Sequence, residues 1–245
     1  MKDRIDKVLT DKGLVTSRSQ AKSLIEKGDV TCNGVIVKKA GELIEVDSEL
    51  IVSGTQFVGR GAFKLEKAIS EFKLEIKDKI FLDVGASTGG FTEVLLLNHA
   101  QKVYAIDVGH NQLANKLKED PRVINLEGTN IRELHELSEL ADGAVMDLSF
   151  ISITKVLDHV SNLLKSQGFL MALIKPQFEA GRDLLPKDGV IKDENLRQKI
   201  LSEVIAYAEG NGWVHQETIV SPIEGKTGNK EFLSWFKKAQ LNSKS

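Results

Sequence analysis

The sequence has little of what would place it outside the cell or in a membrane. Of its 245 residues only Cys32 is a cysteine, so no intramolecular disulfide framework can form, and the chain fits a reducing compartment. The segment Met1–Thr10 is rich in charge and does not resemble a secretory leader. The densest apolar runs, such as residues 169–174, are far too short to cross a bilayer. We therefore expect a cytoplasmic protein with no membrane segment.

The spacing of metal ligands is also missing. None of the histidines stands at a ligand spacing, and no catalytic motif with a histidine accompanies Cys32, which we read as a small buried side chain. We expect no metal. The histidines are His99, His110, His135, His159 and His215.

The composition that is present is ordinary and globular, with 41% hydrophobic and 28% charged residues. The net charge of −2 is unevenly distributed. Residues 1–40 hold nine Lys/Arg and five Asp/Glu, which gives +4 and leaves −6 for the remaining chain. A basic module that precedes a larger acidic one favours a polyanionic partner at the N-terminus.

The first module is predicted to be small and mixed α/β. Apolar spacing predicts a helix over residues 2–12, and a second helix begins after the capping residue Ser17 and ends at Gly28. Short β-prone pieces follow, and Asn33-Gly34 is a hairpin signal. The stretch at residues 53–55 reads as a linker, so the predicted domains are 1–55 and 56–245.

Strands and helices alternate through the second domain. This alternation predicts an α/β fold with a parallel, doubly wound sheet, followed by two more strands at 213–221 and 231–236. The sheet strands are expected at residues 79–84, 102–107, 123–126, 144–147 and 169–174. The helices are expected at residues 62–72, 91–98, 113–118, 153–164 and 195–208.

A glycine turn follows the first strand of this sheet in FLDVGASTGGFT, residues 81–92. In doubly wound sheets the ligand binds beyond the carboxyl ends of the strands. The spacing D-x-G-x-x-x-G-G differs from the dinucleotide fingerprint, and Asp83 would repel a pyrophosphate. A cationic cofactor without phosphate, S-adenosylmethionine, suits this turn better.

The second strand ends at Asp107, where an acid can accept the ribose hydroxyls of an adenosine, and Asn130 follows the third strand. The alternative interpretation is that the two acids only cap turns. It is the weaker one, because Asp83 and Asp107 occur together with the glycines of the turn. The candidate cofactor residues are Asp83, Gly85, Ser87, Gly89, Gly90, Phe91, Asp107, Asn130 and Asp147.

Two later predicted strands are apolar up to a charged residue at their end. This residue is Asp147 in AVMDLSF and Lys175 in LIKPQFE. Methyl transfer to a ribose hydroxyl needs a base, and a lysine can serve when burial and a neighbouring cation favour its neutral form. Lys175 is the candidate base and Lys64 the neighbouring cation, while Asp147 and Glu231 would orient them. Two structural lysine–carboxylate pairs are the alternative interpretation.

Together, GRGAFKL, DVGASTGGFT, AVMDLSF, LIKPQFE and SPIEGKTGNKEFL resemble the hemolysin-A (TlyA) family of FtsJ-like RNA methyltransferases, and residues 4–37 resemble its S4 RNA-binding domain. The resemblance implies a Rossmann-like class I methyltransferase sheet behind a small α+β S4 domain. It implies 2′-O-methylation of ribosomal RNA cytidines by a tetrad of Lys64, Asp147, Lys175 and Glu231. Ribosomal RNA or a ribosomal subunit would be the partner. The candidate RNA-binding residues are Arg4, Arg18, Lys22, Lys27 and Arg60.

Two other functions compete with this one. An RNA-binding protein with an inactive methyltransferase fold would have a broken cofactor turn or no base, and neither is seen. A pore-forming hemolysin would need an amphipathic or membrane-spanning segment and usually a secretion signal.

Overall fold

The computed structural model describes residues 2–12, 14–15, 17–52, 57–181 and 184–239, and the chain divides into two compact units, Met1–Arg60 and Gly61–Ser245. The predicted linker at 53–55, and with it the predicted boundary between residues 55 and 56, lies outside the described residues.

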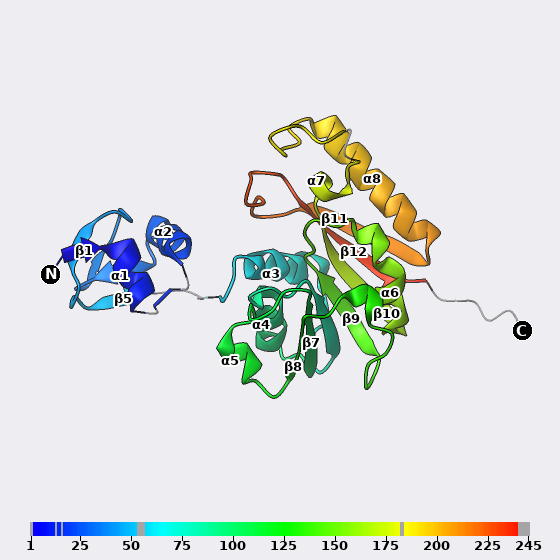
Figure 1. Ribbon diagram of the computed structural model, residues 1–245, viewed down its shortest axis with the longest axis horizontal. Coiled ribbons are helices and arrows are strands. Elements are labelled where there is room, and N and C mark those ends of the chain that lie inside the picture. The colour runs from blue at the N-terminus through cyan, green and yellow to red at the C-terminus, as the bar shows by residue number, and fades with distance from the viewer. Residues whose placement is uncertain (1, 13, 16, 53–56, 182–183, 240–245) are drawn as a thin grey trace, which may run out of the picture. The chain divides into compact units, whose positions relative to one another are not determined.

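The first unit packs two helices against short strands (Figure 1). Its apolar core is built around Ile5, Leu9 and Ile25. Its helices are α1 (Ile5–Asp11) and α2 (Arg18–Lys27). Its strands are β1 (Lys2–Arg4), β2 (Val30–Cys32), β3 (Val35–Ile36), β4 (Leu43–Glu45) and β5 (Leu50–Val52). They form one sheet of β1 and β4 and another in the order β3-β2-β5.

The predicted helix cap, helix end and hairpin turn of this unit are confirmed. The Ser17 side chain accepts a hydrogen bond from the Gln20 amide at 3.2 Å, and α2 ends at Gly28 in the left-handed conformation. Such a cap contributes about 1 kcal/mol. Asn33 and Gly34 both have positive φ, which is the turn type that joins β2 to β3 in a two-residue hairpin.

The start of the predicted first helix is wrong. Residues Lys2–Arg4 form β1, which pairs antiparallel with Leu43–Glu45, and α1 begins only at Ile5. The partner strand is about forty residues away in the chain, so helical periodicity, which is a local signal, does not report it.

The second unit is a seven-stranded sheet in the order β11-β12-β10-β9-β6-β7-β8 (Figure 1). The strands from β10 to β8 in this order are parallel neighbours, while β12 runs antiparallel to both β10 and β11. The strands are β6 (Ile80–Val84), β7 (Lys102–Asp107), β8 (Val123–Glu127), β9 (Ala141–Met146), β10 (Leu164–Ile174), β11 (Trp213–Val220) and β12 (Phe232–Lys238).

Helices cover both faces, because alternate side chains of each strand point to opposite sides. One face, with Leu82 and Ala172, shares a core with helices α6 and α8. On the other face α3 reaches β12, where the ring of Phe72 stacks on Trp235. The helices are α3 (Gly61–Phe72), α4 (Gly90–Leu97), α5 (Asn115–Lys118), α6 (Leu157–Asn162), α7 (Pro176–Glu179) and α8 (Glu194–Gly210), with 3₁₀ turns η1 (Ile131–Glu133) and η2 (Ile153–Lys155).

The helix predicted over 153–164 is shorter than expected. It is divided into η2 and α6, and Leu164 already belongs to β10, where it pairs with Ala141. The strand order reverses between β6 and β9, since the chain goes from β6 to β7 on one side and reaches β9 on the other. This switch point is where doubly wound sheets bind their ligands.

Candidate active site

A fully buried carboxylate lies at the end of β6. Asp83 is 0% exposed, and its Oδ2 accepts hydrogen bonds from the amide of Thr92 at 2.8 Å and from the Thr92 hydroxyl at 2.6 Å. Burial raises the pKa of Asp83 to about 7, although the two bonds from Thr92 oppose this. Its other oxygen, Oδ1, is buried without a partner among the described residues. Asp83 can therefore accept a further donor, which a cofactor ammonium group would supply.

The glycine turn brings β6 against the end of β9. Gly85 has φ +87°, and a Cβ built there would lie 2.7 Å from the backbone oxygen of Asp147. Gly89, at φ +94°, caps α4, and a Cβ there would collide with the side chain of Leu117. Only glycine satisfies both the left-handed backbone and these close approaches. The predicted Gly90 and Phe91 are the first residues of α4.

Asp107 ends β7 and organises the neighbouring loops. Its Oδ2 accepts from the Ser87 amide at 2.8 Å, and its Oδ1 accepts from the Gly109 amide at 2.7 Å. Each carboxylate oxygen has two lone pairs, so both keep acceptor capacity for a ligand hydroxyl. Asn130 caps η1 through the Arg132 amide at 3.1 Å, and its side-chain amide donates to Glu133.

The four predicted catalytic residues meet in one cluster. Lys64 of α3 donates to Glu231, just before β12, at 2.7 Å, and its Nζ lies 3.9 Å from Asp147 Oδ2. Lys175, one residue after β10, places its Nζ 2.6 Å from Asp147 Oδ1, as an ion pair that lacks hydrogen-bond geometry. Both lysine side chains are less than a tenth exposed. Two cations and two anions offset one another, which is what burial of charge requires.

Sequence reasoning missed three residues that support this site. Lys175 donates to the hydroxyl of Ser149 at 2.9 Å, and Gln177 donates to Glu231 Oε1 at 3.4 Å. Thr92 holds Asp83, as described above. Each lies within nine residues of a predicted site residue, but nothing in the sequence distinguishes a supporting polar side chain from an ordinary one.

An aromatic pair of exposed Phe150 and half-buried Phe178 lies beside Lys175 and was also missed. Phe150 is 90% exposed and has φ +67°, and its ring lies 5.1 Å from that of Phe178. The Lys175 ammonium lies 5.8 Å from the Phe178 ring centre. A bulky residue in the left-handed region is strained, and such strain clusters at functional sites.

The first unit contains a cleft of about 640 Å³ in which basic lining residues outnumber acidic ones, called here the basic cleft. Its basic side chains are Arg4, Arg18, Lys22, Lys38 and Lys39. The structure thus brings together three of the predicted RNA-binding residues and adds Lys38 and Lys39. Lys27, the last residue of α2, and Arg60 are not among the residues that line it.

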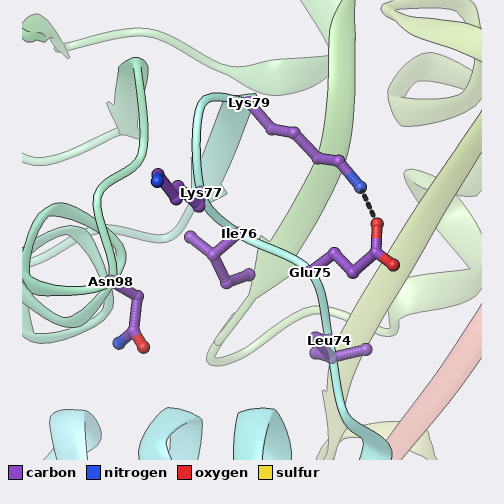
Figure 2. Close-up of a pocket in the computed structure, with 6 residues that line it drawn as sticks. All are labelled: Leu74, Glu75, Ile76, Lys77, Lys79 and Asn98. Atoms are coloured by element: carbon purple, nitrogen blue, oxygen red, sulfur yellow. Dashed lines mark hydrogen bonds and ion pairs between the residues drawn. The ribbon is translucent and has the colours of Figure 1, made fainter.

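A second hollow, of about 400 Å³, lies where the chain enters β6 (Figure 2). Its lining includes an ion pair of 2.8 Å between Lys79 and Glu75, two residues that are a third or more exposed. It precedes β6, whereas the cluster lies past the carboxyl ends of the strands. We assign it no part in the site.

Two kinds of feature are absent from the described ranges. No helix in them combines the length and apolar character needed to span a membrane. No group of three His, Cys, Asp or Glu side chains in them is placed to hold a metal ion.

The sequence matches the family model of the FtsJ-like methyltransferases over residues 57–238 and the family model of the S4 domain over residues 3–50. The chain belongs to the FtsJ-like methyltransferase family. The predicted family and fold class are therefore confirmed, and the basic cleft lies in the S4 domain of this FtsJ-like enzyme.

Two curated relatives span nearly the whole FtsJ-like chain. Hemolysin A of Brachyspira hyodysenteriae is 42% identical over 237 residues, which cover 95% of this chain and 99% of the relative. A Mycobacterium tuberculosis protein named 16S/23S rRNA (cytidine-2′-O)-methyltransferase TlyA is 39% identical over 239 residues, which cover 96% and 89%. A solved structure from Streptococcus thermophilus with the provisional name hemolysin is 40% identical, with a TM-score of 0.76, and covers 97% of this chain and 89% of that one.

Proposed function

We propose that this enzyme transfers a methyl group from S-adenosylmethionine to the ribose 2′-hydroxyl of a cytidine in ribosomal RNA. The observation that carries the proposal is the cluster of buried Lys64, Lys175 and Glu231 around half-buried Asp147, beside the glycine turn. We infer the cytidine substrate from the name of the Mycobacterium tuberculosis relative, which is a 16S/23S rRNA (cytidine-2′-O)-methyltransferase. An enzyme that modifies ribosomal RNA would act in the cytoplasm.

The residues at the switch point fit the cofactor. Asp83 offers a buried oxygen without a partner among the described residues, Asp107 keeps acceptor capacity for ribose hydroxyls, and Gly85 lets the turn pack closely against the backbone of Asp147. None of these groups would stabilise a pyrophosphate, because the two side chains are carboxylates. When bound, S-adenosylmethionine supplies an electrophilic methyl group on a sulfonium.

The cluster would then act on the hydroxyl. In its neutral form Lys175 would accept the 2′-proton of the attacking hydroxyl, and S-adenosylmethionine held beside Asp83, Gly85 and Asp107 would supply the methyl group. Asp147 and Ser149 hold the Lys175 Nζ in position, at 2.6 and 2.9 Å. Glu231 fixes Lys64 beside Asp147 through a hydrogen bond of 2.7 Å.

The exposed Phe150 supports a nucleotide as substrate. Single-stranded bases are commonly held by stacking on aromatic side chains, and each stacked base contributes about 1–3 kcal/mol. Phe150 stands 90% exposed beside Phe178 and Lys175, where a base attached to the reacting ribose would pass.

Substitution of Lys175 tests the mechanism. We expect Lys175→Ala and Lys175→Arg both to lower the rate of methyl transfer to ribosomal subunits by ~10²- to 10⁴-fold, because neither side chain can take the proton. The matched control is Lys165→Arg, at an exposed lysine earlier in the same strand β10. Radiolabelled methyl incorporation, followed by mapping of 2′-O-methylated positions, measures the effect, and calorimetry measures cofactor affinity, which should change only a few fold.

Two results would count against the proposal. Near wild-type activity of Lys175→Arg would remove Lys175 as the base and favour structural ion pairs. A wild-type protein that binds ribosomal RNA and transfers no methyl group would indicate an RNA-binding protein with an inactive fold.

A further inference from the structure

A buried carboxylate lies under the basic cleft. Asp6, in the first turn of α1, is 5% exposed. Its Oδ1 accepts from Arg4 Nε at 3.1 Å, and its Oδ2 accepts from Arg4 Nη2 at 3.0 Å. The same Oδ2 accepts from Arg18 Nε at 3.2 Å and Nη2 at 2.9 Å. One carboxylate therefore binds two guanidinium groups through four hydrogen bonds.

The backbone holds this arrangement in place. The Asp6 amide donates to the backbone oxygen of Ala40 at 3.3 Å, which ties the start of α1 to the loop that carries Lys38 and Lys39. A Cβ on the next residue of that loop, Gly41, would lie 3.3 Å from Arg4 Nη1. The Arg4 guanidinium thus lies between the loop and Asp6 and has little freedom to turn.

The two arginines face solvent although their partner does not. Their side chains are 50% and 54% exposed, whereas that of Asp6 is 7% exposed. A guanidinium has five N–H donors. Because Nε and Nη2 each give one bond to Asp6, three donors of each arginine stay without a partner among the described residues. Those donors lie in a cleft that Lys22, Lys38 and Lys39 also line.

Electrostatics explains why a carboxylate is needed here. Two guanidinium groups this close would repel each other and spread apart in water. The bonds from Arg4 hold the pKa of Asp6 down at about 2, against the opposing effect of its burial, so its charge is present at any working pH. The negative charge of Asp6 between the two guanidinium groups holds Arg4 and Arg18 close together, and the three side chains keep a net positive charge.

We propose that Asp6 is a positioning residue for RNA binding. It holds Arg4 and Arg18 side by side so that their remaining guanidinium N–H groups bind the phosphate backbone of ribosomal RNA. The proposal rests on the RNA substrate proposed above. Paired charged donors of fixed geometry bind phosphate oxygens better than mobile ones, because less side-chain freedom is lost on binding.

A simple charge argument predicts the opposite. Asp6 adds a negative charge to a site that binds a polyanion, so its removal should tighten binding. Glu26 provides the matched control, because it is a second acid of the same cleft, is 62% exposed and lies 3.8 Å from Lys22. Asp6→Asn and Glu26→Gln each remove one negative charge, but only Asp6→Asn frees the arginines.

The experiment measures the affinity of the full chain for purified ribosomal subunits at two salt concentrations. We expect Asp6→Asn to weaken binding by roughly tenfold or more, through lost preorganisation, and Glu26→Gln to leave it unchanged or slightly tighter. Asp6→Glu keeps the charge and moves the carboxylate outward by one methylene, and it should also weaken binding. The amide NMR spectrum of each variant shows whether the first unit stays folded, and Asp6→Glu replaces Asp6→Asn if the latter unfolds it.

A double-mutant cycle separates positioning from general damage. If Asp6 acts through Arg18, Arg18→Gln should cost much less affinity in the Asp6→Asn background than in the wild type. Equal costs in both backgrounds, or tighter binding by Asp6→Asn, would overturn the proposal. If the wild type binds the subunits and Arg18→Gln weakens it while neither Asp6 variant does, this inference alone is wrong. If the wild type binds no subunit, the proposed RNA substrate is wrong.

Discussion

Asp83 links the titration of one side chain to the stability of the methyltransferase unit. Burial raises its pKa in the folded chain from the ordinary value of 3.8 to about 7, so folding favours the neutral form. The stability that this preference contributes is fully present below about pH 4, and it is lost as the pH rises through about 7. Cofactor binding would reverse the preference, because an ammonium group favours the ionised form.

We therefore expect the free energy of unfolding of the wild type to fall between pH 5 and pH 8, and to fall less in Asp83→Asn, which cannot ionise. Both tryptophans, Trp213 and Trp235, lie in this unit, so denaturant unfolding followed by tryptophan fluorescence measures the effect. Asp188→Asn is the control, because Asp188 is 53% exposed and paired with Lys192, which lowers its pKa. Identical slopes for wild type and Asp83→Asn would show that Asp83 is ionised throughout.

At the scale of single elements, the join between β6 and β9 depends on Gly85. An alanine there would have to hold φ near +87° and would bring its Cβ to 2.7 Å from the backbone oxygen of Asp147. The backbone oxygen of Asp147 directly follows a central strand of the sheet, so it cannot move aside as a flexible side chain can. The substitution would displace Asp147, and with it the ion pair to Lys175.

Gly85→Ala should lower the free energy of unfolding by about 2 kcal/mol or more, as expected for a strained backbone with a steric clash, and should abolish methyl transfer. Urea denaturation and the methylation assay measure the two effects. Gly210→Ala is the matched control, since Gly210 ends α8 and a Cβ there would meet nothing within 4 Å. Equal stability of both variants would contradict the close approach at Gly85.

The elements also show how far sequence reasoning reaches. The range of β7 was predicted to the residue because an apolar run ends there in a polar one, which is a local pattern. The strand β1 was missed, because it depends on pairing with distant β4. Likewise, Asp147 and Lys175 stand out as charges after buried strands, whereas Ser149 and Gln177 gain their meaning only from partners that the fold brings near.

At the scale of the whole molecule, charge and chemistry are divided between two units. The first unit has its own apolar core and carries the basic cleft, while the second holds the proposed catalytic cluster and a separate core. Substrate binding and cofactor binding should therefore respond to different substitutions.

The last prediction tests this division with Arg18→Glu combined with Lys22→Glu, both in the basic cleft. RNA affinity should fall and its dependence on salt should flatten, because phosphate contacts that release counterions are lost. Cofactor affinity, measured by calorimetry, should stay the same. The control is Lys192→Glu with Lys199→Glu, which makes the same change of charge at side chains 78% and 68% exposed in the second unit. If that pair weakened RNA binding equally, the net charge of the molecule rather than the cleft would set the affinity.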